Sequence, residues 1–211
     1  MVLQFKTPFG GFAHTVFHIE TGVKAPPTYT DRVGKIGRIT LKFFDIMIGV
    51  VLGLGFQWWP NLVEPWQYAA FIFVYVDLVD YWIDYSSALR RFPPKRELGI
   101  MLDVAIIFTM FLYIYSTQLS IFEFLLCFMA FKIVDVLGLL RTRFEHRPTG
   151  RDRLFVHTWI LTNLIDIVFA VALYLIAGYV LSAPLILAAF VTIRIATRIL
   201  SSYRYREVYF I

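Results

Sequence analysis

Apolar residues fall in six long stretches along the chain. They lie near residues 39–58, 67–89, 98–116, 119–140, 154–177 and 183–201. Each stretch has about the twenty residues that a helix needs to cross the roughly 30 Å hydrocarbon core of a bilayer. The polar segments between them are short. This pattern predicts an all-α, polytopic membrane protein with six transmembrane helices.

The composition supports membrane insertion. Hydrophobic residues make up 59% of the 211 residues and aromatic residues 18%, whereas charged residues make up only 17%. An ordinary water-soluble domain is about one-quarter charged. We therefore expect an integral, multi-pass protein whose surroundings are the lipid bilayer, either of a plasma membrane or of an organelle.

Lysine and arginine lie almost entirely on one side of the predicted topology. They precede the first stretch, join the second to the third and the fourth to the fifth, and follow the last. These residues are Lys24, Arg32, Lys35, Arg38, Arg90, Arg91, Lys95, Arg96, Arg141, Arg143, Arg147, Arg151, Arg153, Arg204 and Arg206. The positive-inside rule then predicts that both the N and C termini are cytoplasmic. The net charge of +5 reflects this topology rather than a nucleic-acid partner.

The segments outside the six stretches are too short for separate folded domains. Residues 1–38 are expected to form a cytoplasmic or interfacial arm, residues 39–201 the transmembrane domain, and residues 202–211 a short cytoplasmic tail. Cys127 is the single cysteine. The sequence has no zinc-binding spacing, no glycine-rich phosphate loop and no Ser/His/Asp arrangement on neighbouring faces. We expect no enzyme activity, no cofactor and no metal.

Acidic residues inside the apolar stretches outnumber basic ones. Eight carboxylates lie there, namely Asp45, Asp77, Asp80, Asp84, Asp103, Glu123, Asp135 and Asp166. The clearly intramembrane cations are Lys132, Arg194 and Arg198. An unpaired charge at the centre of a bilayer costs about 2.5–3.5 kcal/mol on translocon-type scales. The surplus carboxylates must therefore be protonated, hydrated or turned toward a cation.

Sequence spacing gathers many of these charges on single helix faces. Asp77, Asp80 and Asp84 follow an i, i+3, i+7 pattern, and Arg194 and Arg198 are four residues apart. Counted from the basic end of its stretch at 1.5 Å per residue, Asp80 lies about 15 Å deep. We expect each charged face to point inward, in the cytoplasmic half of the bilayer.

Two interpretations of these intramembrane charges remain open. The set, called the charge network below, comprises Asp77, Asp80, Asp84, Lys132, Asp135, Asp166, Arg194 and Arg198. It could simply fix helix orientation, with the arginines meeting Asp80 and Asp84, and with Lys132 meeting Asp135 or Asp166. Alternatively it could form a hydrated cation or proton path or a charge sensor, because purely structural pairing would avoid surplus acid.

The first stretch carries a recognisable signature. Phe43-Phe44-Asp45, followed by Ile-Met-Ile-Gly-Val-Val-Leu-Gly-Leu, resembles the Phe-Ser-Asp signature that opens the pore helix of the lysosomal potassium channel family and its prokaryotic homologues. Tyr81-Trp82 and Leu102-Asp103 are similar to further positions of that family. Phe44 replaces the signature serine, and Tyr85 and Ser86 stand where the family has paired histidines.

The resemblance implies a potassium or other monovalent cation channel that assembles as a homo-oligomer, with a tetramer favoured. The first helix would line the pore, Asp45 would be the signature acid, and Ile46 or Val50 would form the apolar gate. Asp103 would help to concentrate cations at the inner mouth. Gly49, four residues from Gly53, would form a smooth stripe facing the pore axis or a neighbouring subunit.

Two alternatives stand beside the channel. Asn163-Leu-Ile-Asp166 is similar to the Asn-x-x-Asp of the third helix of a voltage-sensor domain, in which Arg194 and Arg198 would be gating charges. The chain could also be a non-conducting accessory subunit of a larger membrane complex. The expected function is therefore a cation channel or cation-coupled transport protein, with these two as alternatives.

Overall fold

The described residues of the chain form a bundle of six long helices. A computed structural model describes residues 5–6, 12–13, 29–177 and 182–209. The helices are α1 (Tyr29–Gly55), α2 (Pro65–Arg91), α3 (Glu97–Tyr115), α4 (Ile121–His146), α5 (Gly150–Ala177) and α6 (Ala183–Tyr209). Short 3₁₀ turns η1 (Phe56–Asn61) and η2 (Ser116–Gln118) follow α1 and α3. Strands β1 (Phe5–Lys6) and β2 (Phe12–Ala13) pair antiparallel near the N-terminus.

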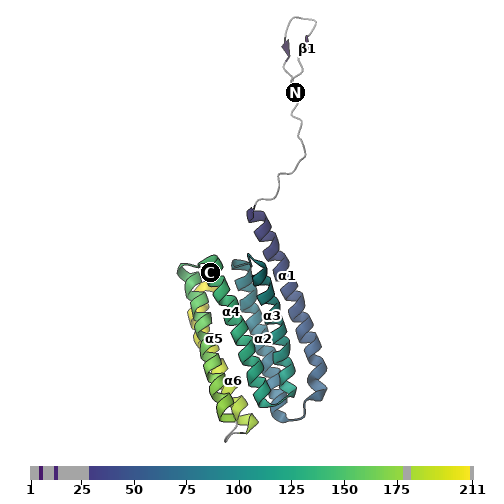
Figure 1. Ribbon diagram of the computed structural model, residues 1–211, viewed down its shortest axis with the longest axis vertical. Helices are drawn as coiled ribbons and strands as arrows, with labels where there is room; N and C mark the ends of the chain where they lie inside the picture. The colour runs from purple at the N-terminus through teal and green to yellow at the C-terminus, as the bar shows by residue number, and fades with distance from the viewer. Residues whose placement is uncertain (1–4, 7–11, 14–28, 178–181, 210–211) are drawn as a thin grey trace.

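The long helices lie side by side with roughly parallel axes and alternating chain directions, α1 at one edge of the bundle and α5 and α6 at the other (Figure 1). α1 packs on α2 and α3, α4 packs between α3 and α5, and α6 packs on α5 and touches α2. The last ten residues of the expected N-terminal arm are helical, because α1 begins at Tyr29. The expected C-terminal tail likewise continues α6 as far as Tyr209. Most of residues 1–28 lie outside the described part of the chain.

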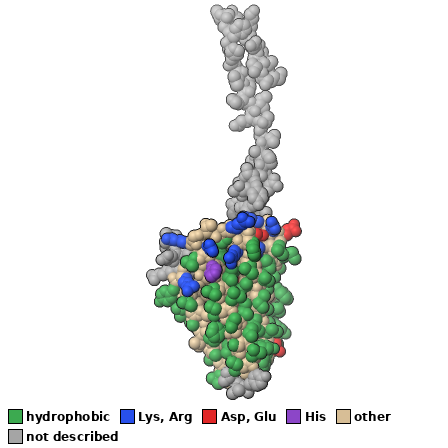
Figure 2. All heavy atoms as spheres, turned by 60° about the vertical axis from the view of Figure 1, so that its left-hand side comes forward, with side chains coloured by type: hydrophobic (Ala, Val, Ile, Leu, Met, Phe, Trp, Pro, Cys, Tyr) green, Lys and Arg blue, Asp and Glu red, His purple; other side chains and the backbone are tan. Residues whose placement is uncertain are grey.

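In the part of the chain that the structure describes, four helical segments are long and apolar enough to cross a membrane. They are Thr40–Asn61, Glu97–Gln118, Gly150–Ala177 and Ala183–Arg204. Their outward residues include Phe108 and Val168, which are 59% and 67% exposed. Figure 2 shows hydrophobic side chains covering the flank of the bundle, with Lys and Arg gathered at one end. This distribution is that of a helical protein whose flank contacts lipid.

Local signals in the sequence explain where α2 and α4 begin. Pro65 occupies the first position of α2, and the side chain of Gln67 accepts a hydrogen bond from the Glu64 N–H at 2.9 Å. In α4 the side chain of Glu123 accepts one from the Ser120 N–H at 3.1 Å. Glu123 therefore belongs to a capping box at the helix end, where a carboxylate is favourable.

At the basic end of the bundle, the connection between α2 and α3 contacts the end of α4. His146 Nε2 lies 3.0 Å from the carbonyl oxygen of Pro93, and its ring packs edge-on against Phe92. The Lys95 ammonium donates to the carbonyl oxygen of Glu145 at 3.2 Å. Nearby, Arg91 pairs with Asp152 at the start of α5 at 3.0 Å.

His146 should make stability depend on pH. Burial lowers its pKa below the ordinary value, because it disfavours the imidazolium. The unfolded chain then binds this proton at a higher pH than the folded chain, so stability is fully present above about pH 6.5 and falls as the pH drops below it. We expect the melting temperature to fall less steeply between about pH 7 and pH 5 in H146Q, which keeps a donor for Pro93. Identical pH profiles for the two proteins would contradict this.

Candidate functional site: the buried charge network

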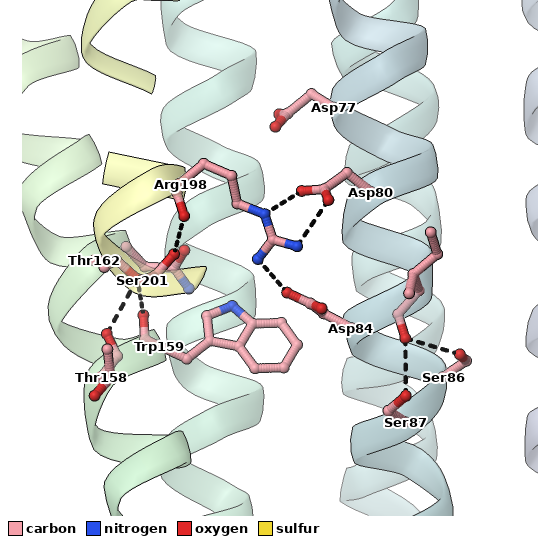
Figure 3. A network of polar contacts seen from close by, with 12 residues as sticks. Asp77, Asp80, Asp84, Ser86, Ser87, Thr158, Trp159, Thr162, Arg198 and Ser201 are labelled. Atoms are coloured by element: carbon pink, nitrogen blue, oxygen red, sulfur yellow. Dashed lines mark hydrogen bonds and ion pairs between the residues drawn. The ribbon is translucent and has the colours of Figure 1, made fainter. Parts of the chain in front are cut away.

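Polar side chains from four helices meet inside the bundle. α2 contributes three aspartates, α4 a lysine and an aspartate, α5 an aspartate, and α6 two arginines. The three aspartates of α2 lie on the face that is turned toward α6 (Figure 3). All eight residues of the charge network thus come from helices that pack on one another, although the sequence separates the acids of α2 from the arginines of α6 by more than 100 residues.

Arg194 joins α6 to both α2 and α5. Its Nε donates to Asp77 Oδ1 at 3.0 Å, and its Nη1 donates to Asp166 Oδ2 at 3.1 Å. The hydroxyl of Thr197 donates to the other oxygen of Asp166 at 2.8 Å. Arg194, Asp77 and Asp166 are all buried. A planar guanidinium offers several N–H donors, so it can hold two carboxylates at once.

Arg198 binds the next pair of aspartates, one turn along α6. Its Nη2 and Nε contact the two carboxylate oxygens of Asp80 at 2.7 and 2.6 Å, and its Nη1 donates to Asp84 (Figure 3). The side chain of Arg198 is 27% exposed and that of Asp80 is 36% exposed. This second cluster therefore reaches the surface of the bundle, unlike the cluster around Arg194. Exposed charged groups such as these favour contact with water or a protein partner over contact with lipid.

Asp135 on α4 is held by three neutral donors. Tyr81 Oη donates to its Oδ1 at 2.9 Å, while Trp159 Nε1 and Asn163 Nδ2 donate to its Oδ2 at 3.0 and 2.7 Å. The residue is 1% exposed. Three hydrogen bonds satisfy most of the acceptor capacity of this buried carboxylate.

Lys132 lies one turn before Asp135 and is 1% exposed. Within the described residues no carboxylate oxygen lies within the 4.0 Å of an ion pair to its ammonium. Instead its Nζ lies 5.0 Å from the ring centre of Phe131, 5.4 Å from that of Phe128 and 5.9 Å from that of Tyr81. Cation–π attraction in a desolvated place is worth about 2 kcal/mol. Longer-range electrostatic interactions connect Lys132 to Asp77, Asp135 and Asp166.

A separate pair lies nearer the basic end of the bundle. Tyr85 Oη donates to Asp103 Oδ1 at 2.6 Å, and Arg141 Nη1 approaches the same oxygen at 3.8 Å. Both Asp103 and Arg141 have buried side chains. A side chain at Gly99 would collide with the Arg141 guanidinium. The glycine therefore allows the arginine side chain to pack against the start of α3. The sequence pattern assigned Arg141 to a loop and so missed this cation.

The predicted pore residues lie apart from the charge network. Asp45 is partly buried and accepts a hydrogen bond from Trp82 Nε1 at 3.0 Å. Ile46, Gly49 and Val50 are exposed on the outer face of α1, Ile46 by 66% and Val50 by 42%. A Cβ at Gly49 would meet nothing within 4 Å. In the single chain these residues therefore line no enclosed path.

A small polar cavity of about 20 Å³ adjoins the charge network. Its lining includes Asp80, Asp84, Lys132, Asn163, Arg194 and Arg198. This space is about what one water molecule occupies in a protein cavity. Near it, Asp77 Oδ2 has no hydrogen-bond partner among the described residues. Counted as ionised, the five carboxylates of the charge network exceed its three cations by two charges.

No cluster of His, Cys, Asp and Glu suited to hold a metal occurs in the described residues. Comparison with family models, with curated proteins and with solved structures finds no significant match to this chain. The functional argument therefore rests on the residues and their geometry.

Proposed function

We propose that the chain crosses the membrane six times with both termini on the cytoplasmic side. Four segments are apolar enough on their own, and α2 and α4 lie among them as helices of 27 and 26 residues, each about 40 Å long. The charges that reduce the apolarity of α2 and α4 are mostly buried inside the bundle, including Asp77, Lys132 and Asp135. The gathering of Lys and Arg at one end supports a cytoplasmic location for that end (Figure 2).

The proposed function is movement of monovalent cations, as a channel or as a cation-coupled transport protein. The observation that carries this proposal is the excess of two carboxylates in the charge network. Burying uncompensated negative charge in a bilayer is costly, so the network is stabilised by taking up protons or cations from solution. The small cavity beside Asp80 and Arg198, with side chains that are partly exposed, supports access from water.

For the channel form of this function we propose α1 as the helix that lines the path in a homo-oligomer. Ile46, Gly49 and Val50 share one outward face of α1, with apolar side chains beside a glycine that approaches no neighbour. Asp45 comes directly before Ile46, on the side of this face that is nearer the basic end of the bundle. In a symmetric assembly such a face can surround an axis and form an apolar constriction that gates by dewetting. The resemblance to tetrameric channels favours four subunits.

Ion flux from liposomes tests the proposed function. Purified protein is reconstituted under a potassium gradient, with sodium and proton-only conditions in parallel and protein-free liposomes as the baseline. We expect flux of potassium, sodium or protons above the baseline. Absence of flux in every condition, from protein shown to be folded, would contradict the proposal and favour the accessory-subunit alternative.

Replacing Val50 by Ser should raise leak through an α1-lined pore. A polar side chain at an apolar constriction favours water, and lowering the barrier by about 1.4 kcal/mol raises flux about tenfold. V76S is the matched control, because Val76 is 64% exposed on α2 and lies outside the proposed gate. Equal flux in V50S, V76S and the unaltered protein would exclude Val50 from the gate. D45N, measured in the same assay, tests the signature acid.

A voltage-sensor-like role is the second candidate. Arg194 on α6 contacts Asp77 on α2 and Asp166 on α5, an arrangement in which a cation-bearing helix faces acids on its neighbours. Moving one charge through the field of the membrane is worth about 2.3 kcal/mol per 100 mV. In this case voltage steps would displace measurable gating charge in the absence of ion flux.

A further inference from the structure

A basic cavity lies between the end of α4 and the start of α5. Its volume is about 240 Å³, and its lining includes Arg143, Arg147, Pro148, Arg153, Val156 and His157. Three arginines thus surround one space, together with a histidine. The cavity is separate from the charge network, because the two linings share no residue.

The turn between the helices places Arg147 at this cavity. Arg147 has φ of 45° and ψ of 56°, in the left-handed region, and its N–H donates to the carbonyl oxygen of Arg143 at 3.2 Å. Gly150 follows with φ of 55° and starts α5. The chain therefore reverses within three residues, which brings arginines from both helices to the same end of the bundle.

The arginines of this cavity make no ion pair in the described part of the chain. The two neighbouring acids contact other residues: Asp152 pairs with Arg91 at 3.0 Å, and Glu145 accepts the N–H of Lys95 at 3.4 Å. Three positive charges around a cavity without an acid fit an anion that carries several acceptor oxygens. Guanidinium groups match the geometry of phosphate oxygens especially well.

Apolar side chains flank the basic cavity. Phe144 and Leu154, each adjacent in sequence to an arginine of the lining, are 76% and 50% exposed. The cavity lies where α4 ends and α5 begins, and Figure 2 shows Lys and Arg gathered at one end of the bundle, next to the hydrophobic flank. A ligand that fits both features has a phosphate head and an apolar tail.

We propose that this cavity binds the phosphate headgroup of an anionic phospholipid on the cytoplasmic side of the membrane. Arg143, Arg147 and Arg153 would contact the phosphate oxygens, while Phe144 and Leu154 would contact the acyl chains. The inference rests on the proposed membrane orientation. Lipid binding does not require the protein to transport cations, so the lipid-binding test and the ion-flux test can give opposite results.

The test is binding of short-chain lipids to the purified full-length protein in neutral detergent. Dioctanoyl phosphatidylglycerol is the anionic probe, dioctanoyl phosphatidylcholine the neutral comparison, and inorganic phosphate the free anion. Bound lipid is counted by native mass spectrometry, and affinity is taken from the rise in melting temperature with lipid concentration. We expect phosphatidylglycerol to bind more tightly than the other two.

Matched variants separate the cavity from general surface charge. R143Q/R147Q/R153Q should bind phosphatidylglycerol about 100-fold more weakly, because the loss of each arginine near the headgroups should lower the affinity about fivefold. R90Q/R96Q/R204Q removes the same charge from exposed positions outside the cavity and should retain binding. All six residues are exposed, so both variants should fold. Equal weakening in the two variants, or binding of inorganic phosphate as tight as that of the lipid, would overturn the proposal.

Discussion

Replacing Arg194 by Gln should lower the free energy of unfolding by about 3–5 kcal/mol, one of the two largest effects we expect from a single substitution in this protein. Removing one member of a buried ion pair leaves the partner charge unpaired, and that cost exceeds the net stability of the intact pair. Here the loss strands two carboxylates, since Arg194 contacts both Asp77 and Asp166. Unfolding in mixed micelles with increasing SDS would measure the change.

Two further variants make the Arg194 prediction specific. R194Q/D77N/D166N removes the stranded charges together with the arginine, so it should recover much of the lost stability. R198Q should cost less than R194Q, because its side chain and that of Asp80 are 27% and 36% exposed and water can solvate the remaining acids. If R194Q and R198Q lowered stability equally, the buried position of Arg194 would not be the source of the effect.

Replacing Asp135 by Ala should cost at least about 3 kcal/mol. The substitution leaves buried donors on Tyr81, Trp159 and Asn163 without an acceptor, and each unsatisfied donor costs about 1–3 kcal/mol. It also removes a negative charge near Lys132, which has no carboxylate within ion-pair distance in the described residues. The same unfolding assay measures the loss.

The control for Asp135 is D45A. Among the described residues Asp45 accepts one hydrogen bond, from Trp82, and it is only partly buried, so D45A should lose much less stability than D135A. A double-mutant cycle with K132M and D135A then measures the coupling between the two residues of α4. A loss in D135A no larger than that in D45A would contradict the role of the three donors.

Regular spacing made one side of the charge network predictable. Asp77, Asp80 and Asp84 share a helical face because 3.6 residues make one turn, and the cost of charge in lipid requires that face to turn inward. The expected contacts of Arg198 with Asp80 and Asp84 are present. The six apolar stretches likewise anticipated the six long helices, although α1 begins ten residues earlier than the expected first span.

Partners across helices were not predictable to the same degree. Arg194 contacts Asp77 and Asp166 rather than Asp80 or Asp84, because the contact depends on the axial offset of α6 against α2 and α5, which spacing within one helix does not contain. Lys132 lies among aromatic rings instead of pairing directly with Asp135 or Asp166.

Helix ends were the other source of error. The sequence pattern places Glu123 within an apolar stretch but does not show that its side chain caps the start of α4. Arg141 was counted as a loop residue, yet α4 continues to His146 and directs the arginine to Asp103. In both cases the apolar stretch gave the wrong helix boundary by a few residues, which is enough to change the environment of a long or charged side chain.

The separation in sequence between Asp77 and Arg194 has a consequence for synthesis. The two residues are 117 positions apart. At about 5–20 residues per second, the ribosome adds that length in roughly 6–23 s. During this interval α2 is already available for insertion while the arginine that neutralises its acid does not yet exist. The early helices must therefore be held by water, protons or the insertion machinery, and the final hairpin completes the bundle by supplying the missing positive charge.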